Sequence, residues 1–234
     1  EDPGYAPVRN TFRDRGFAIT DVSVDEDGID LDSLPVNIRS AAYVSPSNNA
    51  FTGSLMPIGR RYEMLSWASA NDSYIIEDDY DSEFRFHAHP MASLYSMSAE
   101  GRVIYMNTFS KTLAPSIRIS YMVLPAHLMA EFRRRLGFYS CTVPSFEQYT
   151  LARFLSRGHF EKHINRMRKF YRSRRNRVIA LLENCAFADK LTIHEADAGL
   201  HFLLKVDTPI SDRELTEKLL GWGIKIHSLS HYYH

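Results

Sequence analysis

The chain has 234 residues, of which 44% are hydrophobic, and its 28 Lys and Arg are balanced by 28 Asp and Glu. This length can bury one large core, or a large core and a smaller one, and a net charge of zero excludes an overall attraction to nucleic acid or an anionic membrane. No apolar run approaches 18 residues and no signal peptide is present, so we expect a soluble, cytoplasmic protein. The two cysteines, Cys141 and Cys185, are far apart, which indicates a reducing compartment and neither a disulfide framework nor a zinc ribbon.

The first third of the chain alternates short apolar runs with turns, starting with a turn at Pro3-Gly4. A helix is predicted over Pro57–Asn71 from apolar residues at helical spacing and a proline in the first turn. Strands are predicted at Ala18–Val24, Ile29–Leu34, Ala41–Val44 and Tyr74–Glu77. The order strand, helix, strand across the last three elements predicts a β-α-β unit of a parallel sheet.

The most informative stretch is Val103–Leu124, in which two apolar runs flank a polar segment containing Lys111. The runs predict buried strands, Val103–Met106 and Ile119–Leu124, so Lys111 is expected in a loop at the end of a strand. Asp78 follows the strand Tyr74–Glu77 in the same way, and parallel strands would bring both side chains to one edge of the sheet.

A lysine and a carboxylate at one edge of a sheet are the pair that pyridoxal phosphate requires. The lysine binds the aldehyde as a Schiff base, and the carboxylate keeps the ring nitrogen protonated. Thr108, Ser110 and Arg118 could hold the phosphate through hydroxyl and guanidinium contacts. From residue types alone, the alternatives are a surface lysine in a polar turn at Lys111 and a solvated acid at Asp78.

The remainder of the chain is predicted to be helical, and then to form a smaller α+β unit. Helices are predicted at Ala126–Leu136, Ser145–Ser156 and His159–Asn184. The α+β unit is predicted to contain strands at Leu191–His194, Leu200–Val206 and Ile224–His227, and a helix Glu214–Leu220 that a capping box opens at Ser211. The change of pattern divides the chain into a large domain, 1–184, and a small domain, 185–234.

The segment Arg153–Arg177 carries ten Lys and Arg and a single acid, Glu161. It is interpreted as the solvated face of a long helix, with a nucleic-acid-binding stripe as the alternative. His159 and His163 are one helical turn apart, but no H-E-x-x-H motif accompanies them, so surface histidines are favoured over a metal site. His87-Ala88-His89 is interpreted as a turn for the same reason.

Several motifs together resemble one family. The segments IIEDDYDSEFRF at Ile75–Phe86 and YMNTFSKTLAPSIRISYMVLP at Tyr105–Pro125 resemble fold-type-I pyridoxal phosphate enzymes. Within these, the DDYDSEFR block is most similar to the aminotransferase-like domain of MocR/GabR transcription regulators. The match extends over nearly the whole chain, through EDPGY, YVSPSN, LMPIGRR and DAGLHF. It implies an α/β fold with a mostly parallel large-domain sheet, helices on both faces, and a smaller α+β C-terminal domain.

The resemblance assigns a role to individual residues. Lys111 resembles the lysine that forms the Schiff base, and Asp78 the aspartate that pairs with the pyridine nitrogen. Tyr80 resembles the tyrosine bonded to the ring hydroxyl, while Arg118 and Thr108 resemble phosphate ligands. After Pro46-Ser47 the sequence departs from the family, which shows a proline where Phe51 stands, and Asn49 is the candidate that this loop offers.

The family also has parts that these 234 residues lack. They are a phosphate-binding glycine-serine loop, a ring-stacking aromatic residue, a substrate-binding arginine and an N-terminal winged helix-turn-helix, so we expect the chain to be part of a larger protein. The resemblance implies a homodimer that binds DNA only through the winged helix-turn-helix. Two functions remain open. One is a regulator's effector domain that binds pyridoxal phosphate and senses an amino compound, and the other is an active aminotransferase acting on an amino acid.

Overall fold

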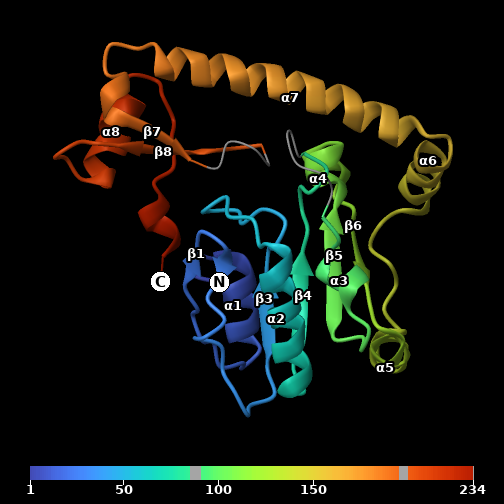
Figure 1. Cartoon of the computed structure of the whole chain (residues 1–234). Coiled ribbons are helices and arrows are strands. Elements are labelled where there is room, and N and C mark those ends of the chain that lie inside the picture. The colour runs from blue at the N-terminus through green and yellow to red at the C-terminus, as the bar shows by residue number, and fades with distance from the viewer. Residues whose placement is uncertain (85–90, 195–199, 234) are drawn as a thin grey trace.

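The computed structural model describes residues 1–84, 91–194 and 200–233, and its centre is a four-stranded sheet (Figure 1). The strands lie in the order β3 (Ala41–Val44), β4 (Tyr74–Asp78), β5 (Val103–Thr108) and β6 (Ser120–Val123). β3, β4 and β5 are parallel, and β6 is antiparallel to β5. The four strands predicted for this sheet, and its mostly parallel arrangement, are therefore confirmed.

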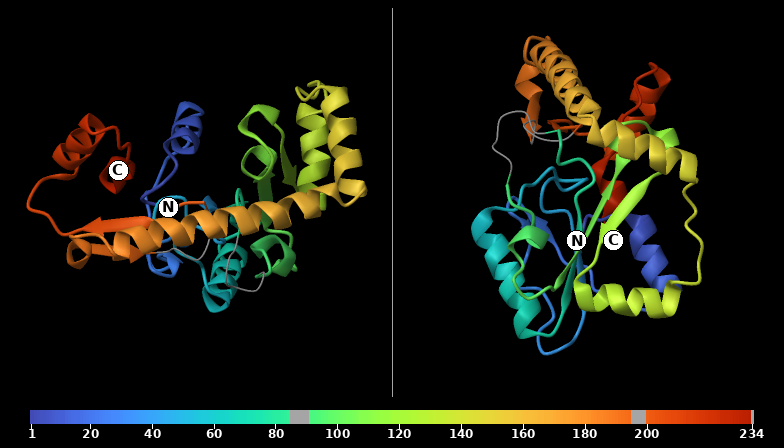
Figure 2. Two further views of the ribbon diagram at one scale, coloured as in Figure 1. Left: turned by 90° about the horizontal axis from the view of Figure 1, so that it is seen from above. Right: turned by 90° about the vertical axis from the view of Figure 1, so that its right-hand side faces the viewer.

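The sheet forms because its central strands bury β-branched residues against helix α2 (Ile58–Ala70). Val44, Ile75 and Val103 are completely buried, and so are Met64 and Ala68 of α2. Figure 2 shows α2 on one side of the sheet and helices α1 (Ala6–Asp14) and α5 (Ala126–Leu136) on the other. A short helix on the α2 side, α3 (Leu94–Met97), was not predicted. The two-faced α/β architecture is as expected.

The N-terminal region differs from the prediction. The strand expected over Ala18–Val24 is reduced to β1 (Val24–Asp25), and that over Ile29–Leu34 to its partner β2 (Gly28–Ile29). Val22 and Leu34 are nevertheless buried. The alternation in sequence therefore indicated which side chains face the core, although the regular strand pairing is limited to β1 with β2 and a single bridge between Asp2 and Ser23. Helix α1 was not predicted. It has no buried residue, and Tyr5 at its N-cap provides no side-chain cap.

Helices α6 (Ser145–Ser156) and α7 (His159–Glu183) follow as predicted, and α7 passes over the carboxyl edge of the sheet toward the small unit (Figure 1). Ile164 of α7 is buried and Phe160, Met167 and Tyr171 are partly buried, which confirms the predicted inner face. Most of the basic residues of α7 lie on its exposed side.

The small unit contains β7 (Leu191–His194), antiparallel to β8 (Leu203–Val206), and helix α8 (Asp212–Gly221). Ser211 caps α8 by accepting a hydrogen bond from the Glu214 backbone N–H, as the capping box predicted. The strand predicted at Ile224–His227 is wrong, because this segment is not a strand and pairs with no strand among the described residues, and Ile224 is half exposed. The remaining short elements are η2 (Ala188–Lys190) and η3 (Leu229–Tyr232).

The predicted domain boundary after residue 184 stays a prediction, although α7 ends at Glu183 and a separate two-stranded sheet follows it. Within the described part of the chain, no helix is both long enough and apolar enough to cross a membrane. The turn predicted at His87-Ala88-His89 lies outside the described residues. So do Arg85-Phe86 and Asp197-Ala198-Gly199 of the family motifs.

Candidate functional site

The structure places Asp78 and Lys111 at the same edge of the sheet. Asp78 is the last residue of β4 and pairs in register with Met106 of β5. Lys111 follows β5 in a single helical turn, α4 (Phe109–Thr112), where the sequence had predicted a loop. Its side chain is exposed, and its amine lies 6.0 Å from the centre of the Tyr80 ring.

Asp78 lies on the α1 side of the sheet, where two opposing effects act on the pKa of its carboxyl. Burial raises the pKa of its carboxyl, while a hydrogen bond from the Tyr43 hydroxyl to Oδ2 acts in the opposite direction. Tyr43 was not predicted as a site residue. It pairs with Ile76 of β4, so its side chain shares a face with Asp78. The alternation of the two strands would have been enough to find it, once their register was known.

A second group surrounds the Tyr80 hydroxyl. The side-chain amide of Asn48, which is 3% exposed, donates to the Asp81 oxygens at 3.0 and 3.2 Å and to the Tyr80 hydroxyl at 3.4 Å. Burial raises the pKa of Tyr80, and the nearby carboxylates, Asp81 first, raise it further. The sequence offered two adjacent asparagines and could not tell which one faces this side.

Asn49, the residue of this loop predicted to contact the cofactor, uses its side chain for hydrogen bonds within the loop and to Glu1. Its Oδ1 accepts hydrogen bonds from the backbone N–H groups of Phe51 and Thr52, and its Nδ2 donates to Glu1 at 3.1 Å. These contacts shape the turn, as asparagine side chains commonly do. A direct contact of Asn49 with a cofactor stays a prediction.

The predicted phosphate ligands gather at the ends of β5 and β6. The Thr108 hydroxyl lies 3.0 Å from the Ser110 hydroxyl and accepts the Ser110 backbone N–H at 3.2 Å. Thr108 pairs in register with Ser120, the first residue of β6, and Arg118 precedes Ser120 by two residues in the chain. Arg118 follows the short helix η1 (Pro115–Ile117) with a left-handed backbone, φ 49°, and its side chain is exposed.

Two histidines from distant parts of the chain come close to Lys111. His201 of the small unit has its pKa lowered, mainly by burial and then by the Lys111 charge, while a hydrogen bond to the Ala50 backbone opposes the shift. His163 of α7 lies with Nε2 2.9 Å from the Thr112 carbonyl oxygen, next to Lys111. His163 was expected at the surface, and it instead connects α7 to the turn that carries Lys111. His201 belongs to the DAGLHF motif and His163 was considered as a metal ligand, but the sequence predicted neither of them near Lys111.

The side chains at this edge fit pyridoxal phosphate by their chemistry. An amine at Lys111 suits the aldehyde, a partly buried carboxyl at Asp78 suits the ring nitrogen, and a phenol at Tyr80 suits the ring hydroxyl. Hydroxyls at Thr108 and Ser110 and a guanidinium at Arg118 suit the phosphate. A metal site has no comparable support, because the described residues contain no group of three or more metal-ligating side chains.

We expect the stability of the protein to depend on pH through Asp81. Burial raises the pKa of this carboxyl from 3.8 to about 7. The folded state therefore binds the proton more tightly than the unfolded state, so the stabilisation is complete below pH 3.8 and is lost as pH rises toward 7. Asp81→Asn should remove this dependence, worth about 1.4 kcal/mol for each pKa unit. Thermal unfolding of the cofactor-free proteins should favour the variant more at pH 8 than at pH 5, and an equal difference at both would contradict the assignment.

In sequence, this chain is similar to curated bacterial transcription regulators. The HTH-type transcriptional regulator YdeL of Bacillus subtilis is 42% identical over 236 residues, which cover 100% of this chain and 51% of YdeL. The probable rhizopine catabolism regulatory protein MocR of Rhizobium meliloti is 35% identical over 98% of this chain and 46% of its own length. The chain thus spans about half the length of these relatives. No protein-family model matches it.

Among solved structures, the kynurenine aminotransferase of Pyrococcus horikoshii superposes with a TM-score of 0.78. It is 25% identical, and the match covers 91% of this chain and 55% of the enzyme. The sequence relatives identify the kind of protein, the structural relative identifies the fold, and both extend over nearly all of the chain. The chain belongs to the MocR-type family of HTH transcription regulators, of which it is the aminotransferase-like domain with the fold of the type I aminotransferases.

Proposed function

We propose that the chain is the effector domain of a transcription regulator, that it binds pyridoxal phosphate covalently through Lys111, and that it senses an amino compound. The observation that carries the proposal is that Lys111 and Asp78 lie at one sheet edge, with the Lys111 amine 6.0 Å from the centre of the Tyr80 ring. The regulator relatives, which match the whole chain, support the regulatory role. The aminotransferase relative, whose structure was solved in complex with PMP, supports the choice of cofactor.

Bound pyridoxal phosphate supplies an electrophilic aldehyde conjugated to an electron-accepting ring. The chain's own residues fix where that chemistry happens. The Lys111 amine provides the attachment point, and the Asp78 carboxylate holds a proton on the ring nitrogen. The Tyr80 hydroxyl, kept protonated by burial, donates to the ring oxygen. Thr108, Ser110 and Arg118 hold the phosphate.

Adding amino acids to the cofactor-loaded full-length protein, and following its absorbance, tests the proposal. A sensor should exchange Lys111 for the amino compound and then stop, because the bound ligand is the signal. Conversion of the cofactor to its pyridoxamine form with release of a keto acid would instead indicate transamination. No spectral response to any amino compound would contradict sensing.

The second candidate function is an active aminotransferase. It is favoured by the fold shared with a kynurenine aminotransferase at 25% identity. In that case Lys111 would also move the proton between the substrate and the cofactor as a general base. The absorbance experiment separates the two functions, since only the enzyme converts the cofactor to its pyridoxamine form and releases a keto acid.

We also propose that the full-length protein is a homodimer and that it contacts DNA through a helix-turn-helix domain outside these 234 residues. Phe138 and Tyr139, just after α5, and Phe146 and Tyr149, within α6, are each more than two-thirds exposed. Exposed aromatic residues are typical of protein contacts. Light scattering at micromolar concentration should give the mass of a dimer, and a monomer mass throughout would contradict this.

A further inference from the structure

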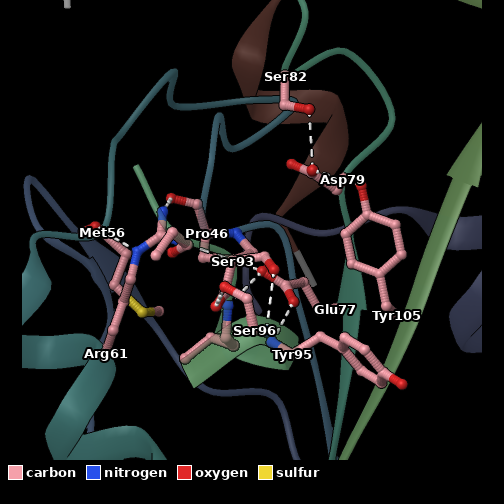
Figure 3. Close-up of polar contacts among 12 residues, drawn as sticks. Pro46, Met56, Arg61, Glu77, Asp79, Ser82, Ser93, Tyr95, Ser96 and Tyr105 are labelled. Carbon is pink, nitrogen blue, oxygen red and sulfur yellow. Dashed lines mark hydrogen bonds and ion pairs between the residues drawn. The ribbon is translucent and has the colours of Figure 1, made fainter. Parts of the chain in front are cut away.

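Arg61 of α2 is an arginine with no exposed surface at all. Its guanidinium donates to three backbone carbonyls, those of Met56 at 3.0 Å, Pro46 at 2.7 Å and Ala92 at 3.0 Å. Figure 3 shows the side chain turned toward Pro46 and Met56, with Glu77 beside it. Burying a guanidinium is costly unless its donors are bonded and its charge is balanced, so a residue of this kind needs an explanation.

Two of these carbonyls are the two ends of one loop. Pro46 and Met56 begin and close the segment 46–56, which is also closed by a hydrogen bond from the Met56 N–H to the Pro46 carbonyl at 3.0 Å. Inside it, the Asn49 N–H donates to the Ser54 carbonyl at 3.0 Å. The Arg61 side chain therefore holds the two ends of a loop whose interior is ordered by backbone hydrogen bonds within the loop.

The same arginine connects this loop to the strand that carries Asp78. Its Nη1 lies 4.0 Å from Oε1 of Glu77, which is also fully buried and immediately precedes Asp78 in β4. The Glu77 carboxylate in turn accepts the N–H groups of Leu94 and Tyr95 at the start of α3, both at 2.9 Å. Arg61 and Glu77 thus bind together loop 46–56, the end of β4 and α3.

We propose that Arg61 is a positioning residue for the cofactor site, which acts by holding loop 46–56 so that the Asn48 amide stays on Tyr80 and Asp81. The inference rests on the proposed function, because Tyr80 matters here only as a neighbour of pyridoxal phosphate. The contacts connect Arg61 to Tyr80 in three steps. Arg61 fixes the two ends of the loop, the loop presents Asn48, and Asn48 orients the Tyr80 hydroxyl and the Asp81 carboxyl.

Arg61→Lys tests this role, because lysine keeps the charge beside Glu77 but lacks the planar fork that reaches three carbonyls. In the full-length protein we expect pyridoxal phosphate to bind about tenfold more weakly, which corresponds to about 1.4 kcal/mol. The matched control is Arg60→Lys. Arg60 is the preceding residue of α2, but its guanidinium bonds Asp25 at 2.5 Å and the Gly28 and Ile29 carbonyls, not a carbonyl of the loop, and its substitution should leave cofactor affinity unchanged.

A double-mutant cycle with Asn48→Ala distinguishes positioning from a general loss of stability. If Arg61 acts through Asn48, Arg61→Lys should weaken binding in the native background and change it less than about twofold in the Asn48→Ala background. Equal losses in both backgrounds, or unchanged binding by Arg61→Lys alone, would overturn the inference and leave the proposed function intact. Failure of the native protein to bind pyridoxal phosphate would instead reject the proposed function, and this role with it.

A measurement on the native protein covers the case in which Arg61→Lys does not fold. The Arg61 Nε–H donates to the Met56 carbonyl, and the Met56 N–H donates to Pro46. If the side chain holds the loop closed, both protons should exchange with solvent through the same opening event, with the same opening free energy at each denaturant concentration once each rate is corrected for its intrinsic exchange rate. Faster exchange of the Met56 N–H, while Arg61 stays protected, would show that the loop opens without it and would overturn the proposal.

Discussion

Lys111→Ala is expected to abolish the cofactor adduct that borohydride makes permanent in the full-length protein. The expectation follows from geometry, because Lys111 leaves the end of β5 at the edge where Asp78 ends β4, with its amine near the Tyr80 ring. Alanine keeps the short helix α4 but removes the only atom of residue 111 that can bond to an aldehyde. Mass spectrometry after reduction should find the pyridoxyl group on Lys111 in the native protein and no such group in the variant.

The matched control for this experiment is Lys162→Ala. Lys162 is an exposed lysine of α7, and it should have no influence on adduct formation. An adduct that persists in Lys111→Ala, on any other lysine, would remove Lys111 from the site.

Asp78→Asn is expected to weaken pyridoxal phosphate binding by about one to two decades. A charge-assisted hydrogen bond contributes roughly 1.5–3 kcal/mol, and asparagine cannot hold a proton on the ring nitrogen. The Tyr43 hydroxyl, which donates to Asp78, favours the charged carboxylate that this role requires. Covalent attachment at Lys111 should still occur, while any chemistry at the ligand α-carbon should be suppressed.

The control for Asp78→Asn is Asp72→Asn, an exposed aspartate at the turn before β4 that pairs with Arg102. Titration of both variants with pyridoxal phosphate should show a loss only for Asp78. If Asp78 were a solvated turn acid, its substitution would change affinity by less than about twofold, and that result would exclude it from the site.

Tyr80→Phe should behave differently from Asp78→Asn. The Tyr80 hydroxyl, held protonated by burial and by the neighbouring Asp81 charge, would bond the ring oxygen rather than the ring nitrogen. Its loss should therefore mainly move the pH at which the cofactor absorbance changes, with a smaller effect on affinity. The same shift in both variants would contradict the separate roles.

The sequence by itself determined the elements on which the site is built. The strands Tyr74–Asp78 and Val103–Thr108 and the helix between Ile58 and Ala70 were predictable, because apolar periodicity bounded by turn residues is a local signal. The expectation that Asp78 and Lys111 meet also needed no coordinates. It follows from the parallel direction of two consecutive strands, whose carboxyl ends must emerge at one edge.

Only the tertiary structure decided which polar side chains surround these two residues. Asn48 and Asn49 are identical in type and adjacent, and the backbone of loop 46–56 alone decides that Asn48 faces Tyr80 while Asn49 bonds within the loop. The contacts of Tyr43 with Asp78, and of Arg61 with three carbonyls, depend on strand register and loop closure between distant segments. Ile224–His227 is a further example: its alternation predicted a strand, but within the described residues this segment pairs with no strand, because pairing depends on distant parts of the chain.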